Sequence, residues 1–173
     1  MFKNPCIVLG ATTFAVLAAF SGIGAATSAA DPTDNSPMTQ LMGMLPKGFD
    51  SSNCAPADTP PKDSLATVDC SQNSLPNGPT GGRFSLYPDA ATLDAHFRKG
   101  AGEDVVQPCP GGLLSPGDWH YNRTPNEAAG KLVCGTYKNS PDLMWSQNDR
   151  LLLGNLWGSD LTAIYQFWAK STE

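Results

Sequence analysis

The sequence is poor in charge and in histidine, and its basic residues are outnumbered. Only 16% of the 173 residues are charged, against about 25% in an average soluble protein. Eleven lysines and arginines face 16 acids, for a net charge of −5. Nucleic-acid-binding domains present a basic face, so we expect no nucleic-acid partner. Two histidines leave little material for an enzyme that depends on histidine.

Several sequence motifs of catalysis and metal binding are also absent. No C-x-x-C pair occurs, which argues against a zinc site or a redox-active dithiol. There is no G-x-S-x-G nucleophile elbow and no G-x-x-x-x-G-K-[ST] phosphate loop. We therefore expect no catalytic residue of these types, no metal and no cofactor.

The first thirty residues, by contrast, have the three parts of a secretory signal. Lys3 is the only charge before Asp31, an apolar stretch follows it, and the stretch ends in the small residues Ser28-Ala29-Ala30. We expect cleavage after Ala30, which leaves a secreted or cell-envelope protein with no stable membrane insertion. The alternative is an uncleaved anchor, since the apolar stretch nearly reaches the roughly 20 residues that span a bilayer.

Four cysteines follow the predicted signal, namely Cys54, Cys70, Cys109 and Cys134. An even number of cysteines in an exported chain indicates disulfides, here two, which can be connected in three ways. We favour Cys54–Cys70 and Cys109–Cys134 because each of these bonds closes a local loop.

The sequence pattern indicates an α+β fold, an antiparallel sheet with helices packed on one face. Helices are expected after Ser36-Pro37, from Asp89 to Lys99, and after Ser159 or Asp160; strands are expected at 65–70, 83–87, 104–107, 119–121, 131–137, 143–146 and 150–157. The last three strands form a meander because only short turns join them. We expect residues 31–44 to be an N-terminal segment with a short helix, and 45–173 a single domain braced by the disulfides.

Two helical patterns carry further predictions. Thr124-Pro125-Asn126-Glu127 has the T-x-x-E form of a capping box and predicts one helical turn, ended by Gly130. In the last helix Leu161, Ile164, Tyr165 and Trp168 form one apolar stripe. We expect this stripe to be buried; the alternative is a helix that docks to a partner.

The clearest candidate for ligand binding is the run Trp119-His120-Tyr121 with Arg123. On a strand, Trp119 and Tyr121 would share a face and could form an aromatic platform for a sugar or another flat ligand. His120 and Arg123 would then be polar partners. The plainer interpretation, which we favour, places Trp119 in the core and the others at the surface. A third hypothesis is a small hydrolase that uses His120 with a carboxylate.

A series of short segments, taken in order, resembles a known family. They are Leu45-Pro46-Lys47-Gly48-Phe49, Leu65-Ala66-Thr67-Val68-Asp69-Cys70 with Asn73, Gly78-Pro79-Thr80, Arg83-Phe84-Ser85-Leu86-Tyr87, Cys109-Pro110-Gly111-Gly112, Pro116-Gly117-Asp118-Trp119, Gly130-Lys131-Leu132-Val133-Cys134-Gly135-Thr136, and Trp145 before Leu151-Leu152-Leu153. This order is similar to the extracytoplasmic domain of some mycobacterial serine/threonine protein kinases, which also occurs alone as an exported protein. The resemblance implies two disulfides and a sensor-like or binding role toward an envelope ligand or protein. It offers no catalytic residue to carry over.

Overall fold

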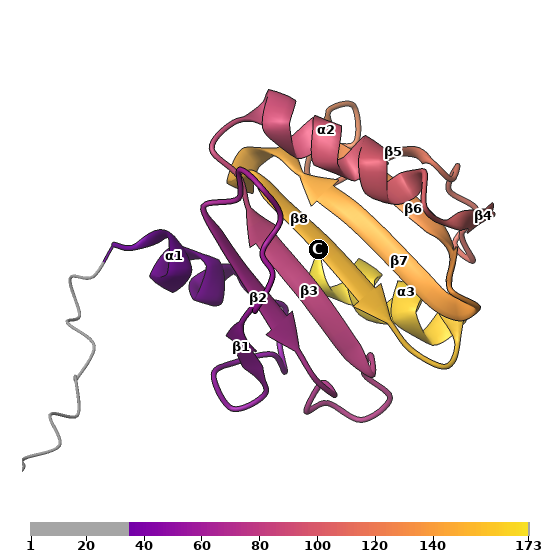
Figure 1. The fold of residues 1–173 in the computed structure, drawn as a ribbon. Helices are drawn as coiled ribbons and strands as arrows, with labels where there is room; N and C mark the ends of the chain where they lie inside the picture. Colours follow the sequence, from indigo (N-terminus) through magenta and orange to yellow (C-terminus); the bar gives the residue numbers. More distant parts are fainter. Residues whose placement is uncertain (1–34, 173) are drawn as a thin grey trace, which may run out of the picture. The chain divides into compact units, whose positions relative to one another are not determined.

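A single antiparallel sheet of eight strands organises the protein (Figure 1). The computed structural model describes residues 35–172, so the predicted signal and its cleavage point lie outside the described residues. The strands are β1 (Cys54–Pro56), β2 (Ala66–Cys70), β3 (Gly81–Leu86), β4 (Val105–Gln107), β5 (Gly117–His120), β6 (Ala128–Tyr137), β7 (Ser140–Gln147) and β8 (Leu152–Trp157). Their order is β1-β2-β3-β8-β7-β6-β4, and β5 also pairs with β6. The predicted meander is confirmed as β6, β7 and β8.

The three α-helices among residues 35–172 begin where the sequence predicts them. They are α1 (Pro37–Met44), α2 (Ala90–Ala101) and α3 (Leu161–Ser171). Ser36 Oγ accepts a hydrogen bond from the Thr39 N–H at the start of α1. Asp89 and Asp160 cap α2 and α3 in the same way, with N···O distances of 2.8 and 3.0 Å. Each cap satisfies an N–H that has no partner within its helix.

The helices divide between the two faces of the sheet. In β6 and β7, Leu132 and Leu143 join the core that holds Ile164 of α3, whereas Val133 and Met144 pack against Phe97 of α2. Successive strand residues point to opposite faces, so α2 and α3 lie on opposite sides, as Figure 1 shows. The α+β class and the antiparallel sheet are confirmed. The helices are not confined to one face, because these strands are apolar on both sides.

The helical turn predicted from the T-x-x-E pattern does not form. Glu127 N–H donates to the Thr124 carbonyl oxygen at 3.1 Å, which closes a simple turn, and strand β6 starts at Ala128. Gly130 pairs with Trp119 of β5, and a side chain at Gly130 would collide with the Ser146 carbonyl oxygen. Strand pairing on both sides of this segment therefore overrides its local helical signal.

Both predicted disulfides are confirmed. Cys54–Cys70 joins directly opposed residues of β1 and β2, and Cys109–Cys134 ties the loop after β4 to the middle of β6. Cys54 therefore belongs to the short edge strand β1. The bonds are compatible with an extracellular protein. Between residues 35 and 172, no helix has the length and apolar character needed to span a membrane.

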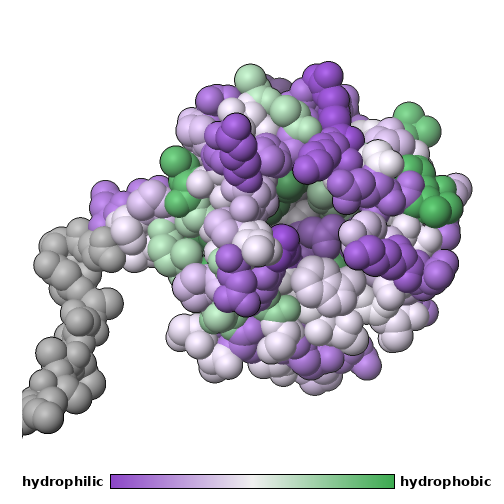
Figure 2. All heavy atoms as spheres, in the orientation of Figure 1, coloured by the Kyte–Doolittle hydropathy of each residue, from purple (hydrophilic) through white to green (hydrophobic). Residues whose placement is uncertain are grey.

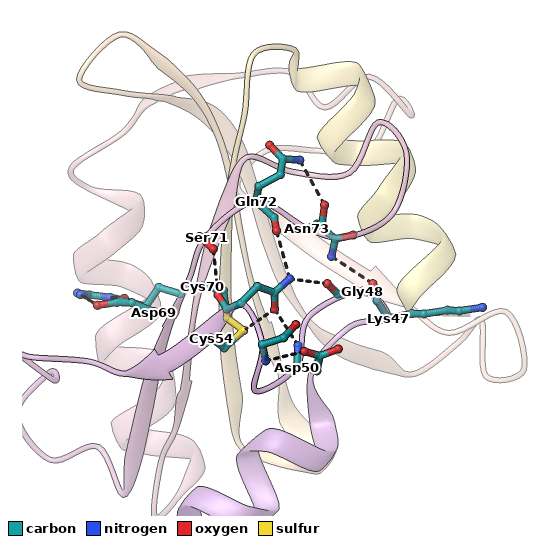
Figure 3. The surroundings of a disulfide bond; sticks show 12 residues. Lys47, Gly48, Asp50, Cys54, Asp69, Cys70, Ser71, Gln72 and Asn73 are labelled. Atoms are coloured by element: carbon teal, nitrogen blue, oxygen red, sulfur yellow. Dashed lines mark hydrogen bonds and ion pairs between the residues drawn. A yellow bond between two sulfur atoms is a disulfide. The ribbon is translucent and has the colours of Figure 1, made fainter.

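Two asparagines fasten the chain around the first disulfide (Figure 3). The Asn53 amide donates to the carbonyl oxygens of Gly48 and Gln72, at 2.8 and 3.1 Å. Asn73, only 2% exposed, donates to the Lys47 carbonyl oxygen and accepts from the Leu75 N–H. Gly48 has a φ of +88° and packs against the Asn73 amide, where a side chain would collide. This network holds the segment after α1 against the end of β2.

Candidate functional site

The predicted site residue Trp119 belongs to the hydrophobic core. Its side chain is 1% exposed, and its indole N–H donates to the Ser146 carbonyl oxygen at 2.8 Å. The Trp119 ring meets the rings of Tyr121 and Trp168 edge to face, with centroids 4.9 and 5.6 Å away. Trp119 thus supports Tyr121 from behind and offers no open ring face to a ligand.

His120 is exposed at the end of β5, beside a shallow hollow of about 250 Å³. The hollow is lined by Leu113, Trp119, His120, Asn122, Tyr165, Trp168, Ala169 and Thr172. No carboxylate is among these lining residues, so the hollow does not bring His120 together with the acid that the hydrolase hypothesis requires.

Tyr121 and Arg123 border a second hollow, of about 260 Å³, which we call the Tyr121 hollow. Its lining is Tyr121, Arg123, Thr124, Glu127, Ala128, Ala129, Asn148 and Asp149. The Arg123 guanidinium carbon lies 4.4 Å from the centroid of the Tyr121 ring, within the range of a cation–π contact.

The Tyr121 hydroxyl is held by two neighbouring side chains. It donates to Asp149 Oδ1 at 3.0 Å and accepts a hydrogen bond from the Gln147 amide. Burial is the main cause that raises the pKa of Tyr121, so the hydroxyl stays protonated and acts as a donor. Of the four predicted residues, the structure brings Tyr121 and Arg123 together, places His120 at the other hollow, and buries Trp119.

A second polar cluster, which sequence reasoning missed, crosses the face of the sheet that α2 partly covers. Arg83 forms a two-point ion pair with Asp69, at 2.5 and 2.7 Å. The Asn155 amide donates to Asp142 Oδ2 at 3.0 Å. Asn155 lies opposite both Arg83 and Met144 in the strand register, which places these residues on the α2 face. We call Asp69, Arg83, Asn155 and Asp142 the polar row.

Asp142 is a buried acid with a second acid nearby. It is 4% exposed, and burial, reinforced by the charge of Asp104, raises its pKa to about 7. Burial and the charge of Glu103 raise the pKa of Asp104 to about 6. Asp104 Oδ2 is buried and has no hydrogen-bond partner within the described part of the chain. Gly135, opposite Asp142, lets the Val105 carbonyl oxygen pass close by, which carries Asp104 toward Asp142.

These raised pKa values predict how stability depends on pH. Because Asp142 binds a proton more tightly when folded than when unfolded, the free energy of unfolding should fall as pH rises from about 4 to about 7. Urea denaturation across this range measures the slope. Asp142→Asn, which keeps the size but cannot ionise, should remove much of that slope, whereas Asp58→Asn at an exposed position should not. An unchanged slope in Asp142→Asn would contradict the prediction.

The sequence gives only a weak signal for the polar row. Asn155 interrupts the apolar strand Leu152–Trp157, and Asp142 opens the apolar run Leu143-Met144-Trp145. Polar residues inside predicted strands are a signal that could have been followed, but their pairing depends on strand register.

Neither a scan against protein-family models nor searches of curated proteins and of solved structures finds a match to this chain.

Proposed function

We propose that this protein is an exported, non-enzymatic binding domain whose ligand occupies the Tyr121 hollow. The observation that carries the proposal is the placement of Arg123 at its rim. Its guanidinium lies over the Tyr121 ring, and none of the ion pairs among residues 35–172 involves it. A cation without an ionic partner, held over a tyrosine ring at the rim of a hollow, can contact an acceptor group on a ligand.

The other residues of the hollow support binding rather than catalysis. The Tyr121 hydroxyl already donates to Asp149 and accepts from Gln147, so it is fixed as part of a hydrogen-bonded network. A sensor-like role toward an envelope ligand follows from the family resemblance and remains a prediction.

Native mass spectrometry of the exported protein, purified from culture fluid, tests this proposal. We expect a small-molecule adduct on the wild type and a loss of most of it in Arg123→Ala. Arg98→Ala is the matched control, since Arg98 is exposed and paired with Asp94 on α2, and it should keep the adduct. A wild-type protein without any adduct, or an adduct retained by Arg123→Ala, would count against this site.

A further inference from the structure

The α2 face of the sheet has an apolar half and a polar half. The apolar half is covered by α2, where Phe97 packs on Val133 and Met144. The polar half carries the polar row, whose Arg83 and Asp69 side chains are 40% and 41% exposed. Figure 2, drawn in the orientation of Figure 1, shows this side hollowed near its centre, with hydrophilic residues around the hollow. The fold does not require polar side chains such as Arg83 and Asp69 to stay partly exposed on these strands.

An indole lies beside the polar row. In the strand register, Trp157 lies opposite Gly81 on one side and opposite Asp142 on the other. Asp142 in turn lies opposite Gly135 on the next strand. The Trp157 ring occupies the space above Gly81 that a side chain would need. Gly81 and Gly135, which flank Trp157 and Asp142 in the register, add no side chains to this face. Trp157 is partly exposed next to the polar row.

The chemistry of these groups limits the ligand class. Asp69 already neutralises Arg83, so an anion would find no free cation there. A purely apolar ligand would cover the Arg83 N–H groups that Asp69 does not use without pairing them. Asp142 changes its protonation near neutral pH. Asp142 is buried, so the contact with a ligand falls to the Asn155 amide that it holds. An amide both donates and accepts, and a hydroxyl group matches it in both respects. The indole adds an apolar surface for the C–H groups of a ring.

We propose that the polar row and Trp157 form a binding site for a neutral saccharide, separate from the Tyr121 hollow. Asn155, held from beneath by the buried Asp142, contacts its hydroxyl groups, Arg83 contributes the N–H groups that Asp69 does not use, and Trp157 packs against its ring. The site does not depend on the proposed ligand of the Tyr121 hollow.

Tryptophan quenching measures occupation of this site directly. The other three tryptophans, Trp119, Trp145 and Trp168, are at most 3% exposed, so acrylamide quenching reports mainly on Trp157. The probes are glucose, galactose, mannose, arabinose, N-acetylglucosamine and chitobiose at about 10 mM, which would fill most of a site with a Kd of about 1 mM. We expect at least one sugar to protect Trp157 from acrylamide.

Calorimetric titration with that sugar then tests the residues. Asn155→Ala should weaken binding at least about tenfold, as the loss of a buried polar contact would. Arg123→Ala should bind the sugar normally, even if the Tyr121 proposal fails. If Asn155→Ala does not fold, Trp157→Phe provides the second test and should also weaken binding. The proposal would be overturned if none of these sugars protects Trp157. It would also be overturned if Asn155→Ala binds the sugar as tightly as the wild type or, where Asn155→Ala does not fold, if Trp157→Phe does.

Discussion

Replacing Trp168 with alanine is expected to lower the free energy of unfolding by about 3–5 kcal/mol, as for other buried aromatic residues. Trp168 is 3% exposed, and its ring meets those of Trp119 and Tyr165 with centroids 5.6 and 5.5 Å away. Ile164, one turn earlier on α3, is 2% exposed. The predicted stripe of the last helix is thus buried at its centre, and truncation would leave a cavity between α3 and the sheet.

Urea denaturation followed by circular dichroism measures this effect without relying on tryptophan emission. Lys170→Ala, an exposed change on the same helix, is the control and should alter stability by less than about 0.5 kcal/mol. Trp168→Phe, which keeps part of the ring, should fall between the two. If Trp168→Ala unfolds at the same urea concentration as the wild type, the apolar stripe of α3 does not stabilise the fold. That result would favour the alternative hypothesis, in which α3 docks to a partner.

The parts of the fold that were predicted correctly depend on signals close together in the sequence. Ser36, Asp89 and Asp160 mark helix starts because a capping side chain acts on an N–H only three residues later. The meander follows from short turns between apolar runs. The choice of face could not be predicted in this way. In Leu143-Met144-Trp145 every residue is buried, so the pattern does not show which side receives which helix.

The candidate sites show the same limit. Tyr121 and Arg123 are two residues apart, and the structure places them at one hollow. Trp119 lies in the core, as the plainer interpretation of the sequence expected. The polar row joins residues of four strands. Asp69 and Arg83 are 14 residues apart, and Asp142 and Asn155 are 13 apart. Only the strand register brings these two pairs onto one face, and no spacing motif encodes a register.

The Cys109–Cys134 bond is expected to contribute more to stability than Cys54–Cys70. Its loop spans 25 residues against 16, and in the chain-entropy model loops of these lengths give about 3.5 and about 3 kcal/mol. The larger difference comes from burial. Cys109 and Cys134 are 3% and 0% exposed, whereas Cys54 is partly exposed on the edge strand β1.

The surroundings of Cys134 add to this difference. The Ser115 hydroxyl accepts from the Cys134 N–H at 2.9 Å and donates to its carbonyl oxygen at 3.1 Å. The loop between β4 and β5 is therefore fastened to β6 by both the disulfide and Ser115. Without the disulfide, the loop would lose its covalent attachment. The removed sulfur atoms would also leave a cavity in the larger hydrophobic core, to which both cysteines belong.

Urea denaturation of two double variants measures both contributions. Cys109→Ala/Cys134→Ala should lose about 4–5 kcal/mol, near the upper end of the range for a native disulfide. Cys54→Ala/Cys70→Ala, which removes a bond of similar loop length at the edge of the sheet, should lose about 2–3 kcal/mol. Hydrogen exchange would show where the loss acts. In the first variant the amides of β4 and β5 should exchange faster, because both strands pair with β6 on either side of the tethered loop. Equal losses in the two variants would mean that burial of the second bond contributes nothing beyond closure of its loop.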